Sequence, residues 1–337
     1  MTYLSVGDMA QAFRMRRHSA ELQTHLTRLA EEMTSGVRSD LGAAVSGDFR
    51  VLAGLDRSLE TLRAYKTATD EAALFTQTVQ TSLETAATLA SDLAPGLLTA
   101  ATGGSSTLVD IAAGDAKQKL AAVVSALNTQ VADSYLLSGT ATDRKPISGA
   151  DDILAALTVA AAGQVTAAGV QSAVAAWFDA PPGGGGYLDA IYGGAATPPA
   201  PLRIGPGDEA AVDLTAADPA IRDLLKGLAT GALVAGGILP GDAVGRAALL
   251  KTSGETLVAS GNGMASLRAR IGTVEAHVAD VAARNSAETS AIEITRNGLV
   301  AADPYDTASA LEAVQTQIET LYALTARLSR LSLTDYL

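Results

Sequence analysis

Residues 15–33, MRRHSAELQTHLTRLAEEM, and residues 311–331, LEAVQTQIETLYALTARLSRL, carry apolar side chains at heptad spacing near the two ends of this chain. The first series comprises Met15, Leu22, Leu26, Leu29 and Met33, and the second comprises Leu311, Val314, Ile318, Leu321, Leu328 and Leu331. Steps of three, four and seven place such residues in a narrow stripe along one side of a helix, which is typical of a seam with one partner helix. We therefore expect the N-terminal and C-terminal helices to pack together, with the middle of the chain looping out between them.

The composition favours thin helical bundles over a thick aromatic core. Apolar residues make up 48% of the chain but aromatic residues only 4%, with four Phe and one Trp. Ligand pockets are commonly lined by large apolar and aromatic side chains, and this chain has few of them. It has no Cys, which excludes disulfides, thiolate catalysis and zinc sites with Cys ligands.

The charge distribution argues against nucleic acid as a partner. The formal net charge is −12, and residues 1–70 are neutral, so residues 71–337 carry all of the excess negative charge. Nucleic-acid binding needs a basic surface. The one tight basic cluster is Arg14, Arg16 and Arg17, which is either a solvated helix face or a contact to an acidic neighbouring subunit.

Neither a signal peptide nor a membrane span is expected. Residues 1–20 lack an apolar central region and contain Asp8 and three arginines, so export would use a route without a cleaved signal. The uncharged stretch from Ile153 to Phe178 is rich in Ala but interrupted by Gly and Gln. A spanning helix needs about 20 mostly apolar residues, so two short helices fit this stretch better than membrane insertion.

Helical periodicity and stop signals divide the chain into elements. We expect helices over about 8–34, 48–94, 108–137, 242–260, 264–296 and 305–332. Pro95-Gly96 is expected to end or interrupt the second helix, and Gly261-Asn262-Gly263 to kink or break the helical stretch around it.

The composition changes over residues 140–240, which contain nine of the 11 Pro. Two short helices fit residues 151–162 and 166–178, a hairpin fits 202–204 with 211–214, and Asp218-Pro219 is typical of a helix start. The expected fold is therefore mainly α: an elongated antiparallel helical bundle or coiled coil formed by both chain ends, with a small inserted α+β domain. The expected boundaries are 1–139 and 241–337 for the two halves of the helical core and 140–240 for the insert.

The sequence contains no motif that supports catalysis, a cofactor or a metal. His18 and His25 lie two helical turns apart, about 10 Å along the axis, which is too far to share one metal. There is no Gly-Lys pair for a P-loop and no Gly-x-Ser-x-Gly nucleophile turn. We therefore expect a protein that is not an enzyme and has no cofactor.

Several short motifs resemble one family when read in order. Residues 326–337, ARLSRLSLTDYL, are similar to the C-terminus of the hook-associated protein 3 family, the hook–filament junction proteins of the flagellin superfamily. Residues 134–140, SYLLSGT, resemble that family's entry into its outer domain, and residues 29–36, LAEEMTSG, resemble the end of its first helix. Residues 267–272, LRARIG, resemble a further family segment, and the segment 37–41, VRSDL, departs from the family pattern.

The resemblance implies a structural subunit of the bacterial flagellum that adapts the hook to the filament. It implies an extracellular position, export through the flagellar type III channel, self-association in a ring, contacts with a neighbouring hook-associated protein and with flagellin, and an export chaperone. A filament subunit related to flagellin is the alternative within the same class. A cytoplasmic helical adaptor or sensor with a coiled-coil hairpin is the alternative from another class.

Overall fold

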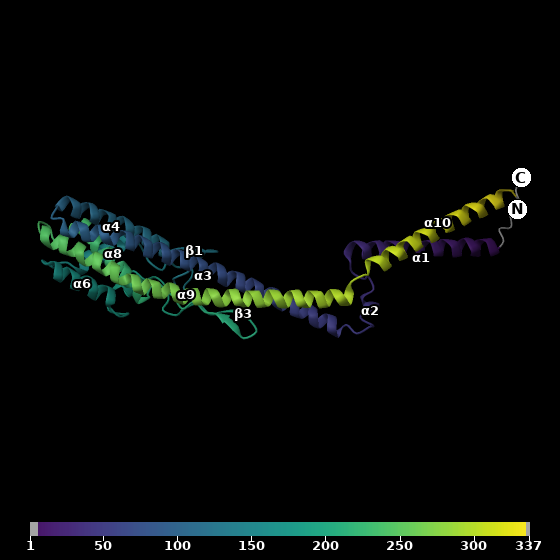
Figure 1. The fold of residues 1–337 in the computed structure, drawn as a ribbon, viewed down its shortest axis with the longest axis horizontal. Coiled ribbons are helices and arrows are strands. Elements are labelled where there is room, and N and C mark those ends of the chain that lie inside the picture. Colours follow the sequence, from purple (N-terminus) through teal and green to yellow (C-terminus); the bar gives the residue numbers. More distant parts are fainter. Residues whose placement is uncertain (1–5, 335–337) are drawn as a thin grey trace. The chain divides into compact units, whose positions relative to one another are not determined.

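The computed structural model describes residues 6–334 and consists mainly of α-helices (Figure 1). The longer helices are α1 (Val6–Ser35), α3 (Arg50–Thr102), α4 (Ser106–Leu127), α5 (Ala150–Ala160), α6 (Ala167–Asp179), α8 (Pro219–Ala235), α9 (Ala243–Val300) and α10 (Pro304–Thr334). The short elements are α2 (Leu41–Ala44), α7 (Tyr187–Ala190) and two antiparallel strand pairs, β1 (Gln130–Val131) with β2 (Ser134–Tyr135) and β3 (Leu202–Gly205) with β4 (Asp208–Ala210). The expected mainly α fold with a small α+β part is confirmed.

The chain divides into two compact units. One unit contains residues 64–285, and the other combines residues 1–63 with residues 286–337. The long helices α3 and α9 each contribute to both units. No helix within residues 6–334 is long and apolar enough to cross a membrane.

Two expected helix breaks were wrong. Pro95 lies inside α3, which continues to Thr102, and Gly261 lies inside α9, which is unbroken to Val300. Pro95 and Gly96 lie on the exposed side of α3, whereas the neighbouring Leu93, Ala94 and Leu97 are buried. Tertiary packing of this kind overrides the local preference of Pro and Gly, because the continuous helix buries more apolar surface than a broken one.

The helix expected to reach residue 137 ends earlier, at Leu127. The side chain of Asn128, the residue after α4, forms two hydrogen bonds with the backbone of Ile147. Its Nδ2 donates to the Ile147 carbonyl at 2.8 Å, and its Oδ1 accepts from the Ile147 amide at 3.0 Å. Ala132 and Asp133 then adopt positive φ angles and form the turn between β1 and β2. Asn competes with helical hydrogen bonds through its own side chain, which explains this early end.

The segment 140–240 forms the expected short helices and a hairpin, and helices α5 and α6 lie within about two residues of the expected bounds. The expected second strand of the hairpin at 211–214 was wrong: β4 ends at Ala210, because the turn after β3 takes only Pro206 and Gly207. Asp218 caps α8, since its Oδ1 accepts from the Ala220 amide at 3.0 Å and Pro219 occupies the first helical position. The domain boundaries expected at 139/140 and 240/241 stay a proposal.

Helix α8 joins this segment to the long helices. It packs against α4 (Figure 1). One hydrophobic cluster runs through α3, α4, α6, α8 and the first half of α9. Glycines allow the close approach: a Cβ added at Gly231 would lie 3.1 Å from the Cβ of Ala116, and one added at Gly227 would lie 2.7 Å from Cδ2 of Leu257. The core of this unit is therefore shared between the segment 140–240 and its flanking helices.

Candidate assembly interface

The terminal helix pair, which we define as α1 with α10, is the element that the heptad series pointed to. The two helices pack side by side and run antiparallel (Figure 1). Met15 near the start of α1 contacts Thr325 near the end of α10, with 4.0 Å between the Met15 Sδ and the Thr325 Oγ1, and Val37 just after α1 pairs with Ala301 just before α10.

The structure brings together most of the residues expected at the seam. Leu22, Leu29 and Val314 are buried in one small hydrophobic cluster. Partly buried side chains pack around these three residues: Leu26, Leu311, Ile318, Leu321 and Ala310. Ala310 was not singled out from the sequence, because a small residue gives a weak signal in a heptad stripe.

The remaining seam residues behave differently. Met15 is half-buried, and the side chains of Leu328 and Leu331 lie outside the described residues. Met33 is 48% exposed and outside the cluster. The antiparallel partner helix begins only at Pro304, and its first turn offers Tyr305 and Asp306, so little apolar surface is available to cover Met33.

A clasp at one end of the terminal helix pair ties together the two chain segments that leave it. The Arg38 amide donates to the Val300 carbonyl at 2.9 Å, and the Ala302 amide donates to the Gly36 carbonyl at 3.0 Å. The Arg38 Nε also donates to the Ala301 carbonyl at 3.1 Å. These contacts join segments more than 260 residues apart in sequence, and the helical periodicity of the sequence did not predict them.

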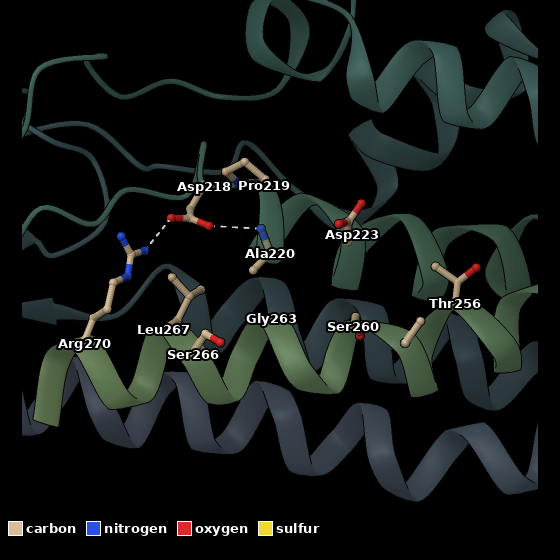
Figure 2. A pocket seen from close by; sticks show the side chains of 11 residues that line it. Asp218, Pro219, Ala220, Asp223, Thr256, Ser260, Gly263, Ser266, Leu267 and Arg270 are labelled. Atoms are coloured by element: carbon tan, nitrogen blue, oxygen red, sulfur yellow. Dashed lines mark hydrogen bonds and ion pairs between the residues drawn. The ribbon is translucent and has the colours of Figure 1, made fainter.

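Figure 2 shows a cleft in the unit of residues 64–285, between the start of α8 and the middle of α9, with a volume of ≈ 570 Å³. Asp218 is engaged on both oxygens: one caps α8, and the other pairs with the Arg270 Nη2 at 2.8 Å. The Ser260 hydroxyl donates to the Leu257 carbonyl at 2.8 Å. Asp223, which also lines the cleft, pairs with the Lys226 ammonium at 3.0 Å.

The histidines do not form a metal site. His18 lies 4.0 Å from a carboxylate oxygen of Glu21 on the exposed side of α1, and His277 lies 3.8 Å from Asp208 beside the β3–β4 turn. Within residues 6–334 no group of three or more His, Cys, Asp and Glu side chains is placed to hold a metal ion.

Comparison with known protein families gives a match to the C-terminal part of the chain. Residues 258–337 match the family described as the bacterial flagellin C-terminal helical region. The matched segment covers the second part of α9 and all of α10, and therefore one helix of the terminal pair. Comparison with curated proteins gives no match. The match concerns the C-terminal part of the chain, residues 258–337, and shows that this segment is similar to the C-terminal helical region of flagellins.

Proposed function

We propose, on the basis of the flagellin C-terminal match, that this chain is a structural subunit of the bacterial flagellum that joins the hook to the filament. The match supports the flagellar part of this proposal, because the matched family is that of flagellins. The matched segment includes α10, the helix that packs against α1. Such subunits assemble outside the cell with copies of themselves. A neighbouring hook-associated protein and flagellin are the further partners that the proposal names, and an export chaperone would accompany the chain before assembly.

The junction role rests on one observation, the closing sequence 331–337, LSLTDYL, which resembles the junction proteins. The terminal helix pair is consistent with this role, because its seam is narrow and buries only a few residues fully. Helices with so little buried surface are marginal alone in water and gain stability from neighbouring subunits. A filament subunit is the second candidate, favoured by the family match itself.

A deletion strain tests the junction role. A strain lacking this chain should still build hooks, and it should release flagellin monomers into the medium because the two lattices are not joined. Re-expression of the chain should restore filaments. Normal filaments in the deletion strain would contradict the junction role, and hooks together with loss of all flagellin synthesis would point to a role before assembly.

A further inference from the structure

Two of the four asparagines in this chain, Asn262 and Asn297, are followed by glycine, and both pairs lie in α9. An asparagine before glycine is chemically vulnerable, because glycine has no Cβ to hinder the approach of its backbone nitrogen to the asparagine side chain. The attack joins the glycine nitrogen to the side-chain Cγ of the asparagine. A helical backbone holds these two atoms apart, so the reaction proceeds from locally opened conformations.

The pair Asn262-Gly263 lies in a packed part of α9. A Cβ added at Gly263 would lie 3.0 Å from the Cβ of Ala220 in α8. Ser260 and Met264, on either side of the pair, are buried. Opening the helix here would break this packing, and the surrounding structure therefore protects Asn262.

The pair Asn297-Gly298 lies at the end of the same helix, which stops at Val300. Both residues are exposed, and no atom lies within 4 Å of the position of a Cβ at Gly298. Helix ends open at a lower free energy than buried helix interiors, and a glycine weakens the last turn further. The reactive conformation is therefore much more accessible at Asn297 than at Asn262.

We propose that Asn297-Gly298 is a site of spontaneous deamidation. The Gly298 nitrogen loses its proton to solvent and bonds to the Asn297 Cγ, and the side-chain nitrogen leaves as ammonia. Water then opens the resulting succinimide ring at one of its two carbonyls, which gives aspartate or isoaspartate. The overall reaction consumes water, releases ammonia and replaces a neutral amide by a carboxylate, and it needs no oxidant or cofactor.

The new carboxylate enters an already acidic neighbourhood. Asn297 lines a cleft of ≈ 600 Å³ together with the carboxylates of Asp56, Glu60 and Glu293. The Arg296 Nε donates to the Asp56 Oδ1 at 2.7 Å, and a carboxylate at position 297 competes for this guanidinium. A negative charge at the C-terminal end of a helix is also unfavourable, so both products destabilise the last turn of α9.

The isoaspartate product also changes the backbone that leads into the clasp. The Asn297 carbonyl accepts a hydrogen bond from the Ala301 amide at 2.7 Å. Isoaspartate lengthens the main chain by a methylene group, which displaces this carbonyl. Because Ala301 and Ala302 carry the clasp contacts to Arg38 and Gly36, we expect the modification to loosen the clasp.

Peptide mapping by mass spectrometry tests the site on the purified full-length chain, sampled during incubation at neutral pH. A synthetic peptide of residues 294–301 in the same buffer sets the time scale for unstructured chain. Conversion at Asn297 should be at least about tenfold faster than at Asn262. An isoaspartate-specific methyltransferase should label the peptide that contains position 297.

Gly298→Ala is the matched variant, because an added methyl group meets no other atom there. It should slow conversion of Asn297 by at least about fivefold, from helix propensity alone. The control Gly261→Ala makes the same change in the same helix, beside Asn262, and should leave the rate at Asn297 unchanged. Hydrogen exchange on the converted chains should show faster exchange of the Arg38 and Ala302 amides, which the clasp holds.

Three results would overturn the site: equal rates at Asn297 and Asn262, a rate unaffected by Gly298→Ala, or an intact Asn297 once the synthetic peptide has fully converted. Unchanged exchange of the Arg38 and Ala302 amides in converted chains would overturn the effect on the clasp. These measurements read the chemistry of the chain itself, so their outcome does not depend on the proposed flagellar role.

Discussion

A methyl group added at Gly231 in α8 should destabilise the packing of this helix. A Cβ there would lie 2.7 Å from the Ser253 Oγ and 3.1 Å from the Ala116 Cβ. The Ser253 hydroxyl is fully buried and donates to the Gly227 carbonyl at 2.6 Å, so it cannot move away without losing a buried hydrogen bond.

The size of the effect follows from two opposing contributions. Overpacking of a filled core costs about 1–3 kcal/mol, whereas replacing Gly by Ala inside a helix returns up to about 1 kcal/mol. Subtracting the second contribution from the first, we expect Gly231→Ala to lower the free energy of unfolding by up to about 2 kcal/mol net. For a unit the size of residues 64–285, that corresponds to a fall in Tm of up to about 8 °C.

Gly261→Ala is the matched control, measured by the same thermal and urea unfolding followed by circular dichroism. Gly261 lies inside α9 with no atom near the position of an added Cβ. This variant should be stabilised, by up to about 1 kcal/mol, because only the helix propensity changes. A Gly231→Ala protein stabilised as much as the Gly261→Ala control would refute the close packing of α8 described above.

Three further predictions follow from other parts of the structure. Leu29→Asp should abolish incorporation into flagella, because it places a charge in the buried seam, whereas Thr27→Asp on the exposed side of α1 should incorporate normally; pull-down from purified flagella measures both. Backbone hydrogen bonds from two loop glycines hold the pKa of the Asp189 carboxyl below its usual range, so its contribution to stability is present above about pH 4 and is lost as the pH falls through the lowered value. Asp189→Asn should therefore make Tm depend less on pH at low pH. A dependence of Tm on pH that is the same in the variant and the natural protein would contradict this role of Asp189. Deletion of residues 150–235 removes α8 and exposes the apolar face of α4. We expect the deletion variant to bind a hydrophobic dye and to unfold without a cooperative transition; a cooperative transition would show that the rest of the core folds without α8.

The terminal helix pair could be anticipated from sequence because its signal is local and repeated. Leu22, Leu29 and Val314 lie on heptad stripes, and each stripe is visible within a single helix. The helix start at Asp218-Pro219 was likewise predictable, since capping depends on neighbouring residues.

Features that depend on distant contacts could not be predicted in this way. Pro95 and Gly261 look like helix breakers, and only the packing around α3 and α9 keeps those helices continuous. The early end of α4 depends on hydrogen bonds from Asn128 to Ile147, 19 residues away. Arg38 contacts the segment before α10, which is 263 residues away in sequence, and no local sequence pattern predicts this contact.

The abundance of this chain in purified flagella tests the proposed junction role most directly. A junction subunit occupies one short zone, so quantitative mass spectrometry should find this chain in every preparation as a minor component, far below the filament protein. Comparison of intact flagella with isolated hooks should place it at the end of the hook. A chain that forms the bulk of the filament would contradict the junction role in favour of a filament subunit, and a chain found only in cell bodies would contradict a flagellar role altogether.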